Sequence, residues 1–211
     1  MPESKKSREL PNREQKRRRI LRAAIDVFAN KGYFAARMTD IAHAADVADG
    51  TLYLYFEGKE HLLMSIFDDV LGRFIDRLDE EIAEVSSPAE KLSIMVRLHL
   101  ETVGRDHELA HVLQIETRHS RRFMSLFTRG KLGQYLNRVR KIIEEGQELG
   151  VFRRDLSPGL ATNMVFGAVD ELVTSWLLSE RPGDLLRHHG PLVRMLTDGI
   201  APCRRHEGET R

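Results

Sequence analysis

Apolar residues recur at intervals of three and four along most of the chain, as in helices that bury one face. The first such stripe predicts a helix from Arg13 to Lys31, ended by Gly32 in the left-handed conformation of a helix C-terminus. Further helices are predicted over residues 40–45, 48–56, 59 to beyond 78, 88–103, 107–116, 121–149, 158–179 and 183–199. No segment has a convincing strand pattern, so the predicted fold class is all-α.

The stretch from Met38 to Lys59 predicts two short helices joined by a tight turn. Thr39 is the predicted N-cap of the first helix, and Asp46 occupies the turn. Spacing places a small apolar core on one side of this unit, formed with the preceding helix by Ile41, Ala42, Ala45, Val47, Leu52 and Phe56. The arrangement is typical of a helix-turn-helix, whose second helix enters the DNA major groove.

Positive charge is concentrated at the N-terminal end. Residues 1–22 hold nine basic and three acidic side chains, a net charge of +6, whereas the whole chain carries +1. A basic patch beside a helix-turn-helix suits DNA phosphates, although a solvated arm, disordered in the free protein over 1–10, would have the same composition. The predicted organisation is a flexible basic arm (1–12), a helix-turn-helix DNA-binding domain (13–57), a ligand-binding and dimerisation domain (58–205, its first helix the connector) and a tail (206–211).

Composition excludes several classes of protein. The single cysteine, Cys203, excludes an internal disulfide framework and fits a reducing compartment. No apolar run approaches the ~20 residues that span a bilayer, and the N-terminus lacks a signal sequence, so we expect a cytoplasmic protein with no membrane partner. No phosphate-binding loop or nucleophile elbow is present, so we expect no enzyme activity.

Candidate DNA contacts follow from the side chains of the second short helix and its surroundings. Gly50 allows a close approach of the backbone, and Thr51 can bond a base edge or pack on a thymine methyl. Tyr53 could equally be a packing residue, Lys59 a solvated charge and Thr39 only a cap. The full predicted set is Arg17, Arg18, Thr39, Ala48, Asp49, Gly50, Thr51, Tyr53, Tyr55 and Lys59.

The same region resembles the TetR family of bacterial repressors. The resemblance rests on Phe28-Ala29, Gly32-Tyr33, Met38-Thr39, Ile41-Ala42, Ala45, Val47, Gly50-Thr51-Leu52-Tyr53, Tyr55-Phe56, Lys59-Glu60 and Leu62-Leu63. Asp46 and Ala48 stand where the family usually has Gly and Ser, and Asp49 adds a negative charge, which weakens Ala48 and Asp49 as phosphate contacts.

The family resemblance implies a homodimer on a palindromic double-stranded DNA operator. The last two helices would form the dimer interface, although burial within one subunit would explain their apolar stripes equally. The residues concerned are Phe166, Val169, Val173, Leu177, Leu192, Met195, Leu196 and Ile200.

Residues 47–56, 114–118 and 164–176 are similar to the FadR-type branch of the family, which represses fatty-acid-degradation genes. This similarity implies no cofactor, but release from DNA by a long-chain acyl-CoA inducer. An acyl chain needs apolar side chains, for which the candidates are Leu98, Val103, Leu113, Met124, Phe127, Phe166 and Val173. The phosphates of coenzyme A need arginines, for which the candidates are Arg105, Arg118, Arg121 and Arg122. Asp170 is a further candidate ligand contact. An ordinary core and solvated surface charge would explain the same residues.

Asp170 lies within a face of its helix that is otherwise apolar, so its carboxylate needs a partner. Three partners are open at this point: Thr174, an arginine such as Arg118, or a ligand. The chain also contains His107-Glu108-Leu109-Ala110-His111, which matches the zinc-protease signature. It falls near a predicted helix start and lacks the glycine-turn extension, so we interpret it as chance; a regulatory metal site drawn from His99, His107, His111 or His119 is the other interpretation.

Two further functions remain open. An efflux-pump repressor could receive cationic drugs through Trp176, Asp170 and Glu171, although only 7% of residues are aromatic. An activator or architectural DNA binder would need no small-molecule ligand.

Overall fold

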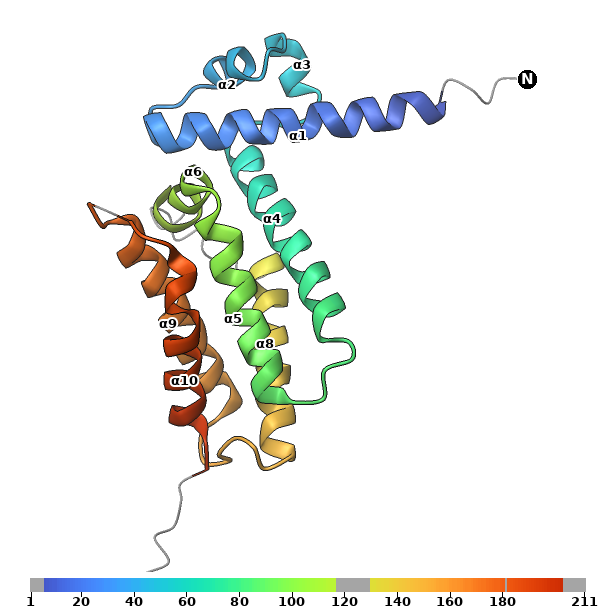
Figure 1. Cartoon of the computed structure of the whole chain (residues 1–211). Helices are drawn as coiled ribbons and strands as arrows, with labels where there is room; N and C mark the ends of the chain where they lie inside the picture. Colours follow the sequence, from blue (N-terminus) through green and yellow to red (C-terminus); the bar gives the residue numbers. More distant parts are fainter. Residues whose placement is uncertain (1–5, 117–129, 181, 203–211) are drawn as a thin grey trace, which may run out of the picture. The chain divides into compact units, whose positions relative to one another are not determined.

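The computed structural model describes residues 6–116, 130–180 and 182–202, with side chains from Arg13 onward. Every regular element in these ranges is a helix (Figure 1), which confirms the predicted fold class. The described residues form two compact units: 6–72 with 106–116, and 73–105 with 130–202. No helix of the described ranges is both long and apolar enough to cross a membrane.

The first unit is built on α1 (Lys6–Lys31), against which α2 (Met38–Ala44) and α6 (His107–His111) both pack (Figure 1). It also contains α3 (Asp49–Tyr53), the part of α4 (Lys59–Ile82) up to Gly72, and the π-helical turn η1 (Val112–Glu116). Its core is apolar, with Ile20, Phe28, Ile41, Leu52 and Phe56 at most 1% exposed. Gly32 ends α1 with φ 75°, as predicted for a left-handed C-terminal residue.

Two predicted helix starts were wrong. Helix α1 begins at Lys6 rather than Arg13, so the expected arm is helical from Lys6 onward. Helix α2 begins at Met38 with Arg37 as its N-cap, so Thr39 is an exposed residue of the first turn and not the cap. The Asp40 carboxylate fixes the start of α2, because it accepts a hydrogen bond of 2.9 Å from the Arg37 backbone N–H. The same carboxylate forms an ion pair of 2.9 Å with Lys31.

The turn into α3 has the predicted geometry, and α3 is shorter than predicted. Asp46 adopts a positive φ of 51°, a conformation that Asp tolerates better than most residues. Helix α3 ends at Tyr53 because the following N–H groups of Leu54 and Tyr55 turn to bonds of the i→i−3 type, to Thr51 and Leu52.

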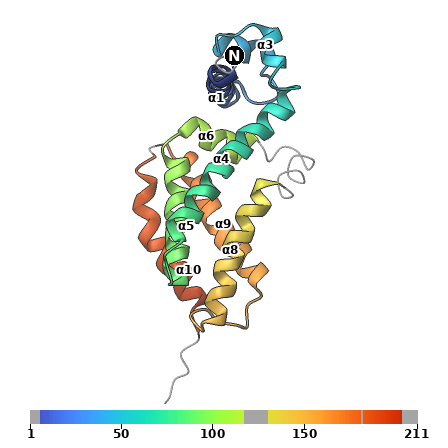
Figure 2. The ribbon, with the colours of Figure 1, turned by 90° about the vertical axis from the view of Figure 1, so that its right-hand side faces the viewer.

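The second unit is a bundle of α5 (Pro88–Gly104), α8 (Lys131–Glu148), α9 (Pro158–Leu177) and α10 (His189–Ile200), together with the part of α4 from Arg73 (Figure 2). Helix α5 packs against α8, α9 and α10, and α8 packs against α9. Ser87 and Ser157 cap α5 and α9, each followed by proline at the first helical position.

The segment predicted as one helix over 183–199 is divided in the structure. A 3₁₀ turn, η2 (Leu185–His188), is followed by α10, which begins at His189. Pro191 explains the division, because a continuous helix would need an N–H at this position to bond the Arg187 carbonyl. The predicted start of the 121–149 helix lies outside the described residues.

Candidate nucleic-acid interface and effector site

Helix α3 buries one side chain and exposes its other face. Leu52 is fully buried against the core of the first unit, whereas Tyr53 is 56% exposed. Ala48, Asp49 and Gly50 are exposed, and Thr51 and Tyr55 are half-buried. Six of the predicted DNA contacts thus lie on α3 or directly next to it with at least part of the side chain exposed, as direct readout of a groove requires.

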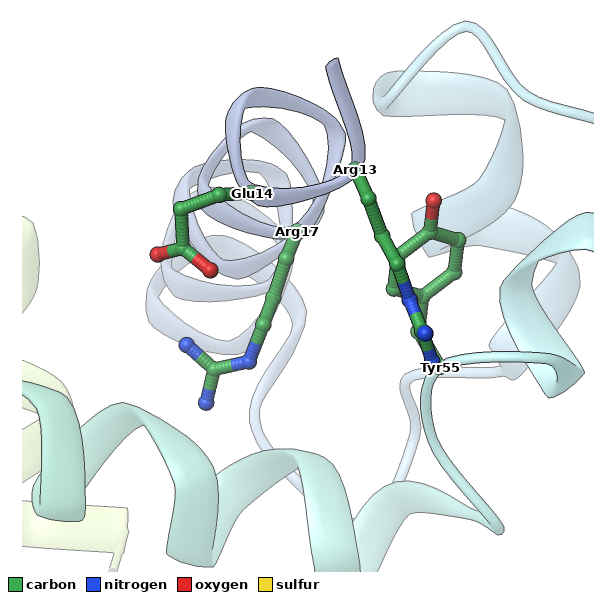
Figure 3. Close-up of a pocket in the computed structure, with 4 residues that line it drawn as sticks. All are labelled: Arg13, Glu14, Arg17 and Tyr55. Carbon is green, nitrogen blue, oxygen red and sulfur yellow. The ribbon is translucent and has the colours of Figure 1, made fainter. Parts of the chain in front are cut away.

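A basic recess adjoins this face. Arg13, Glu14, Arg17 and Tyr55 line a surface hollow of about 450 Å³ (Figure 3). The Arg13 guanidinium lies 5.8 Å from the centre of the Tyr55 ring, and that of Arg17 lies 5.8 Å from the Phe56 ring. The Arg17 guanidinium also lies 3.9 Å from the Asp69 carboxylate. An arginine held over an aromatic ring, such as Arg13, keeps its N–H groups available, so this recess can bind a phosphate. Arg18, also predicted, is exposed on the same helix and pairs with Glu14 at 3.2 Å.

Lys59 supports the loop between α1 and α2. Its ammonium donates hydrogen bonds to the carbonyls of Tyr33 (2.8 Å), Phe34 (3.0 Å) and Ala36 (2.7 Å). It also lies 4.9 Å from the centre of the Tyr33 ring. An ammonium has three donors, and all three are engaged here. Lys59 therefore has no donor left for a phosphate.

Arg19 holds the helix-turn-helix turn and was not among the predicted site residues. Its guanidinium donates a hydrogen bond of 3.2 Å to the Asp46 carbonyl, the residue with positive φ. The basic run containing Arg13 and Arg19 is visible in the sequence, but which arginines face DNA and which face the protein depends on how α1 packs.

Aromatic and polar side chains meet in the interior of the second unit. The Tyr135 ring lies 5.2 Å from Phe74 and 5.8 Å from Phe166, centre to centre. The Tyr135 hydroxyl is 3.1 Å from Nδ1 of His99 and donates to the Met95 sulfur at 3.3 Å. Burial lowers the pKa of His99 to about 4, although the negative charge of Asp170 acts to raise it. His99 is therefore neutral near pH 7.

The negative charge of Asp170 acts on this aromatic cluster. Its charge also acts on Tyr135, whose pKa is raised by burial and then by Asp170. The Thr174 hydroxyl donates to the Asp170 backbone carbonyl at 3.1 Å. The charge of Asp170 thus acts on both His99 and Tyr135, two groups that the sequence pattern did not associate with it.

The predicted ligand contacts are distributed over both units. Leu98, Val103 and Val173 are buried, and Phe166 is half-buried, on the packed helices α5 and α9 of the second unit. Leu113 is half-buried in η1 of the first unit. Arg118, Arg121, Arg122, Met124 and Phe127 lie outside the described residues.

Arg105, the remaining predicted coenzyme A contact, belongs to an ion-pair network. Its side chain is 70% exposed and donates to Glu101 at 3.2 Å. Although burial alone would raise the pKa of Glu101, hydrogen bonds from Arg97 and Arg77 lower it. Glu101 thus remains ionised and holds one nitrogen of the Arg105 guanidinium.

Helices α9 and α10 each combine buried and exposed side chains. Most side chains predicted for a dimer interface are instead buried in the subunit: Val169 and Val173 are inaccessible, and Leu192, Leu196 and Ile200 are at most 9% exposed. Met195 is 65% exposed, as an interface residue requires. Helix α9 presents a separate exposed stripe at helical spacing that the prediction missed, formed by Leu160, Met164, Gly167, Glu171 and Ser175 and continued by the C-cap residue Leu178.

The zinc-protease pattern coincides with α6. His107 and Glu108 are exposed, and Nδ1 of His111 is buried without a hydrogen-bond partner among the described residues. Glu108 approaches Arg22 of α1 at 3.8 Å, and Arg22 also pairs with Asp106. Within the described residues, no three His, Cys, Asp or Glu side chains come together as a metal site.

Two family models cover most of the chain. Residues 20–66 match bacterial regulatory proteins of the tetR family, and residues 67–199 match the C-terminal region of YsiA-like proteins. The chain is 38% identical to the fatty acid metabolism regulator protein of Bacillus subtilis (strain 168) over 185 residues, which cover 86% of this chain and 93% of that protein.

Solved structures give the same result. The fatty acid degradation regulator FadR from Bacillus halodurans superposes with a TM-score of 0.83 at 39% identity, covering 91% of this chain and 97% of that one. FadR from Bacillus subtilis in complex with stearoyl-CoA superposes with a TM-score of 0.82 at 37% identity, covering 86% and 98%. The similarity extends over both units.

Proposed function

Because the chain belongs to the TetR family of bacterial regulatory proteins, we propose that it is a repressor of fatty-acid-degradation genes that long-chain acyl-CoA releases from DNA. The observation that carries this proposal is the similarity over nearly the whole length of a fatty acid metabolism regulator, including one solved with stearoyl-CoA. The chain is a transcriptional regulator and not an enzyme.

In the proposed DNA complex, α3 enters the major groove of the operator. Gly50, Thr51 and Tyr53 face base edges, because Gly50 lies on the side of α3 away from the core and Thr51 and Tyr53 flank it. Phosphates are held on the flanks by Arg17, Arg18, Tyr55 and Thr39, to which we add Arg13 from the recess in Figure 3. Ala48 and Asp49 contribute only backbone N–H groups, since the Asp49 carboxylate would repel phosphate.

The inducer site is proposed in the interior of the second unit. Leu98, Val103, Phe166 and Val173 offer apolar side chains to an acyl chain. Arg105 is suited to a coenzyme A phosphate, because its side chain is 70% exposed. Binding energy there changes DNA affinity only if the acyl-CoA prefers the subunit conformation that does not fit the operator.

The contact between α1 and α6 is a candidate link for this preference. Asp106 follows Arg105 in the chain, caps α6 through a 3.0 Å bond from the Leu109 N–H, and pairs with Arg22 of α1. A displacement of α6 would therefore act on the helix that carries the basic recess.

A homodimer is proposed through the exposed side chains of α9 and α10. The carrying observation is that Leu160, Met164 and Met195 are 51–65% exposed on these two helices. Gly167 leaves open space in the exposed stripe of α9, since a Cβ built there meets no atom within 4 Å. Exposed apolar side chains beside a glycine allow close helix packing across a two-fold axis.

The test is fluorescence anisotropy on a labelled duplex from the gene's own upstream region, titrated with lauroyl-, palmitoyl- and oleoyl-CoA. Free coenzyme A and free fatty acids are the controls. We expect the thioesters to release the DNA and the controls to leave it bound. Tight DNA binding that no thioester disturbs would contradict the inducer assignment and retain the DNA-binding one.

A further inference from the structure

Leu54 is an exposed aliphatic side chain at the end of α3. It is 78% exposed, the largest fraction among the big apolar side chains of the described residues. At about 100° per residue, Leu54 and Gly50 both lie about 160° from the buried Leu52, and Leu54 keeps helical angles (φ −70°, ψ −18°). Leu54 and Gly50 are therefore at the centre of the outward face of α3, and Thr51 and Tyr53 are on its flanks.

Gly50 has no intramolecular reason to be glycine. A Cβ built at this position meets no heavy atom within 4 Å, and its φ is not among the positive values of the described glycines. Glycine weakens a helix relative to alanine, so neither packing nor backbone geometry favours it here. A partner that approaches the α3 backbone closely would explain it.

The surroundings of Leu54 identify the chemistry of that partner. Tyr55, the next residue, lies under the Arg13 guanidinium in the basic recess, so the partner is anionic at this edge (Figure 3). Thr51 and Tyr53 offer hydroxyl groups on either side of the exposed leucine. In the DNA major groove, hydrogen-bonding base edges and phosphates surround one apolar group, the C5 methyl of thymine.

We propose that Leu54 is a specificity-determining residue that packs on the C5 methyl of one thymine in each operator half-site. Gly50, one turn earlier, lets α3 approach the groove closely enough for this contact. The inference rests on the proposed function and adds which base the exposed leucine selects.

The test uses a duplex selected by the purified full-length protein from a random library, with each thymine replaced in turn by uracil, which lacks only the methyl. We expect one position per half-site at which uracil weakens wild-type binding by roughly fourfold, the effect of losing one buried methyl. Leu54→Ala should bind the thymine and uracil duplexes equally at that position. Leu149→Ala, the control, removes a 62% exposed leucine from the second unit and should keep the fourfold difference.

Two outcomes overturn the inference and leave the proposed function intact. In one, no thymine-to-uracil change affects the wild-type protein. In the other, the difference persists in Leu54→Ala and disappears in Thr51→Ser, so that the methyl of Thr51 makes the contact. Failure to select any duplex would overturn both the inference and the proposed DNA binding.

Discussion

Replacing Lys59 tests whether this residue stabilises the fold or binds DNA. The sequence pattern predicts a phosphate contact, whereas in the structure the ammonium donates to the carbonyls of Tyr33, Phe34 and Ala36. These carbonyls lie in the loop that connects α1 to α2. Lys59→Met keeps most of the apolar stem and removes the three donors, so it isolates the hydrogen bonds.

The expected loss of stability follows from these bonds. A hydrogen bond to a charged group contributes about 1.5–3 kcal/mol, and removing a partner also leaves acceptors unsatisfied. The three bonds share one side chain, and water can reach the exposed part of the loop, so they do not add fully. We expect Lys59→Met to lower the free energy of unfolding by about 2–4 kcal/mol.

Two measurements separate the roles. Urea unfolding gives the stability, and the slope of log Kd against log salt concentration counts phosphate contacts, at about 0.9 per contact. For Lys59→Met we expect the stability loss with an unchanged salt slope. The control Arg18→Ala, which removes an exposed arginine of α1, should show the reverse: a smaller slope and stability within about 0.5 kcal/mol of wild type. Unchanged stability with a reduced slope in Lys59→Met would refute the structural role.

Four further predictions use other parts of the molecule. Gly50→Ala should raise the unfolding midpoint, because a Cβ at this position has open space. The same variant should bind the operator at least tenfold more weakly, because the added methyl group meets DNA. Weaker binding together with lower stability would argue against an interface role. His99 has a pKa of about 4 in the folded protein, against an ordinary pKa of 6.5. Between pH 4 and pH 6.5 the unfolded state therefore binds more protons than the folded state. The free energy of unfolding should fall as the pH drops through this range, by up to about 1.4 kcal/mol per pH unit. His99→Asn should flatten that dependence in urea titrations at several pH values. Arg22→Ala should leave DNA affinity without inducer nearly unchanged but raise the acyl-CoA concentration for release about fivefold; an unchanged release curve would exclude the α1–α6 ion pair from coupling. Met195→Asp should shift the protein toward monomer in sedimentation equilibrium, and an intact dimer would place the interface elsewhere.

The all-α class, the helix-turn-helix and most helix positions could be predicted from local pattern. These features depend on residues within one or two helical turns of each other, so they can be recognised directly in the sequence. They are the periodic apolar residues, the serine caps at Ser87 and Ser157, and the left-handed positions at Gly32 and Asp46. The family resemblance, carried by the Gly50-Thr51-Leu52-Tyr53 motif and its neighbours, is likewise a local pattern.

Side-chain partners far apart in the chain could not be predicted. Lys59 looks like a surface lysine, and only the fold brings three loop carbonyls within 3.0 Å of its ammonium. For Asp170 the sequence left Thr174, an arginine such as Arg118 or a ligand as partners; Arg118 lies outside the described residues, and only the fold shows that the charge of Asp170 also acts on His99 and Tyr135 of other helices. The stripes of α9 and α10 could equally have been core or interface, and packing buried Val169 and Val173 while it left Met164 and Met195 outside. Helical periodicity shows which residues share a face, but what covers that face depends on long-range packing. The tertiary structure alone therefore decides whether a side chain belongs to the core, stabilises a loop or forms a binding surface.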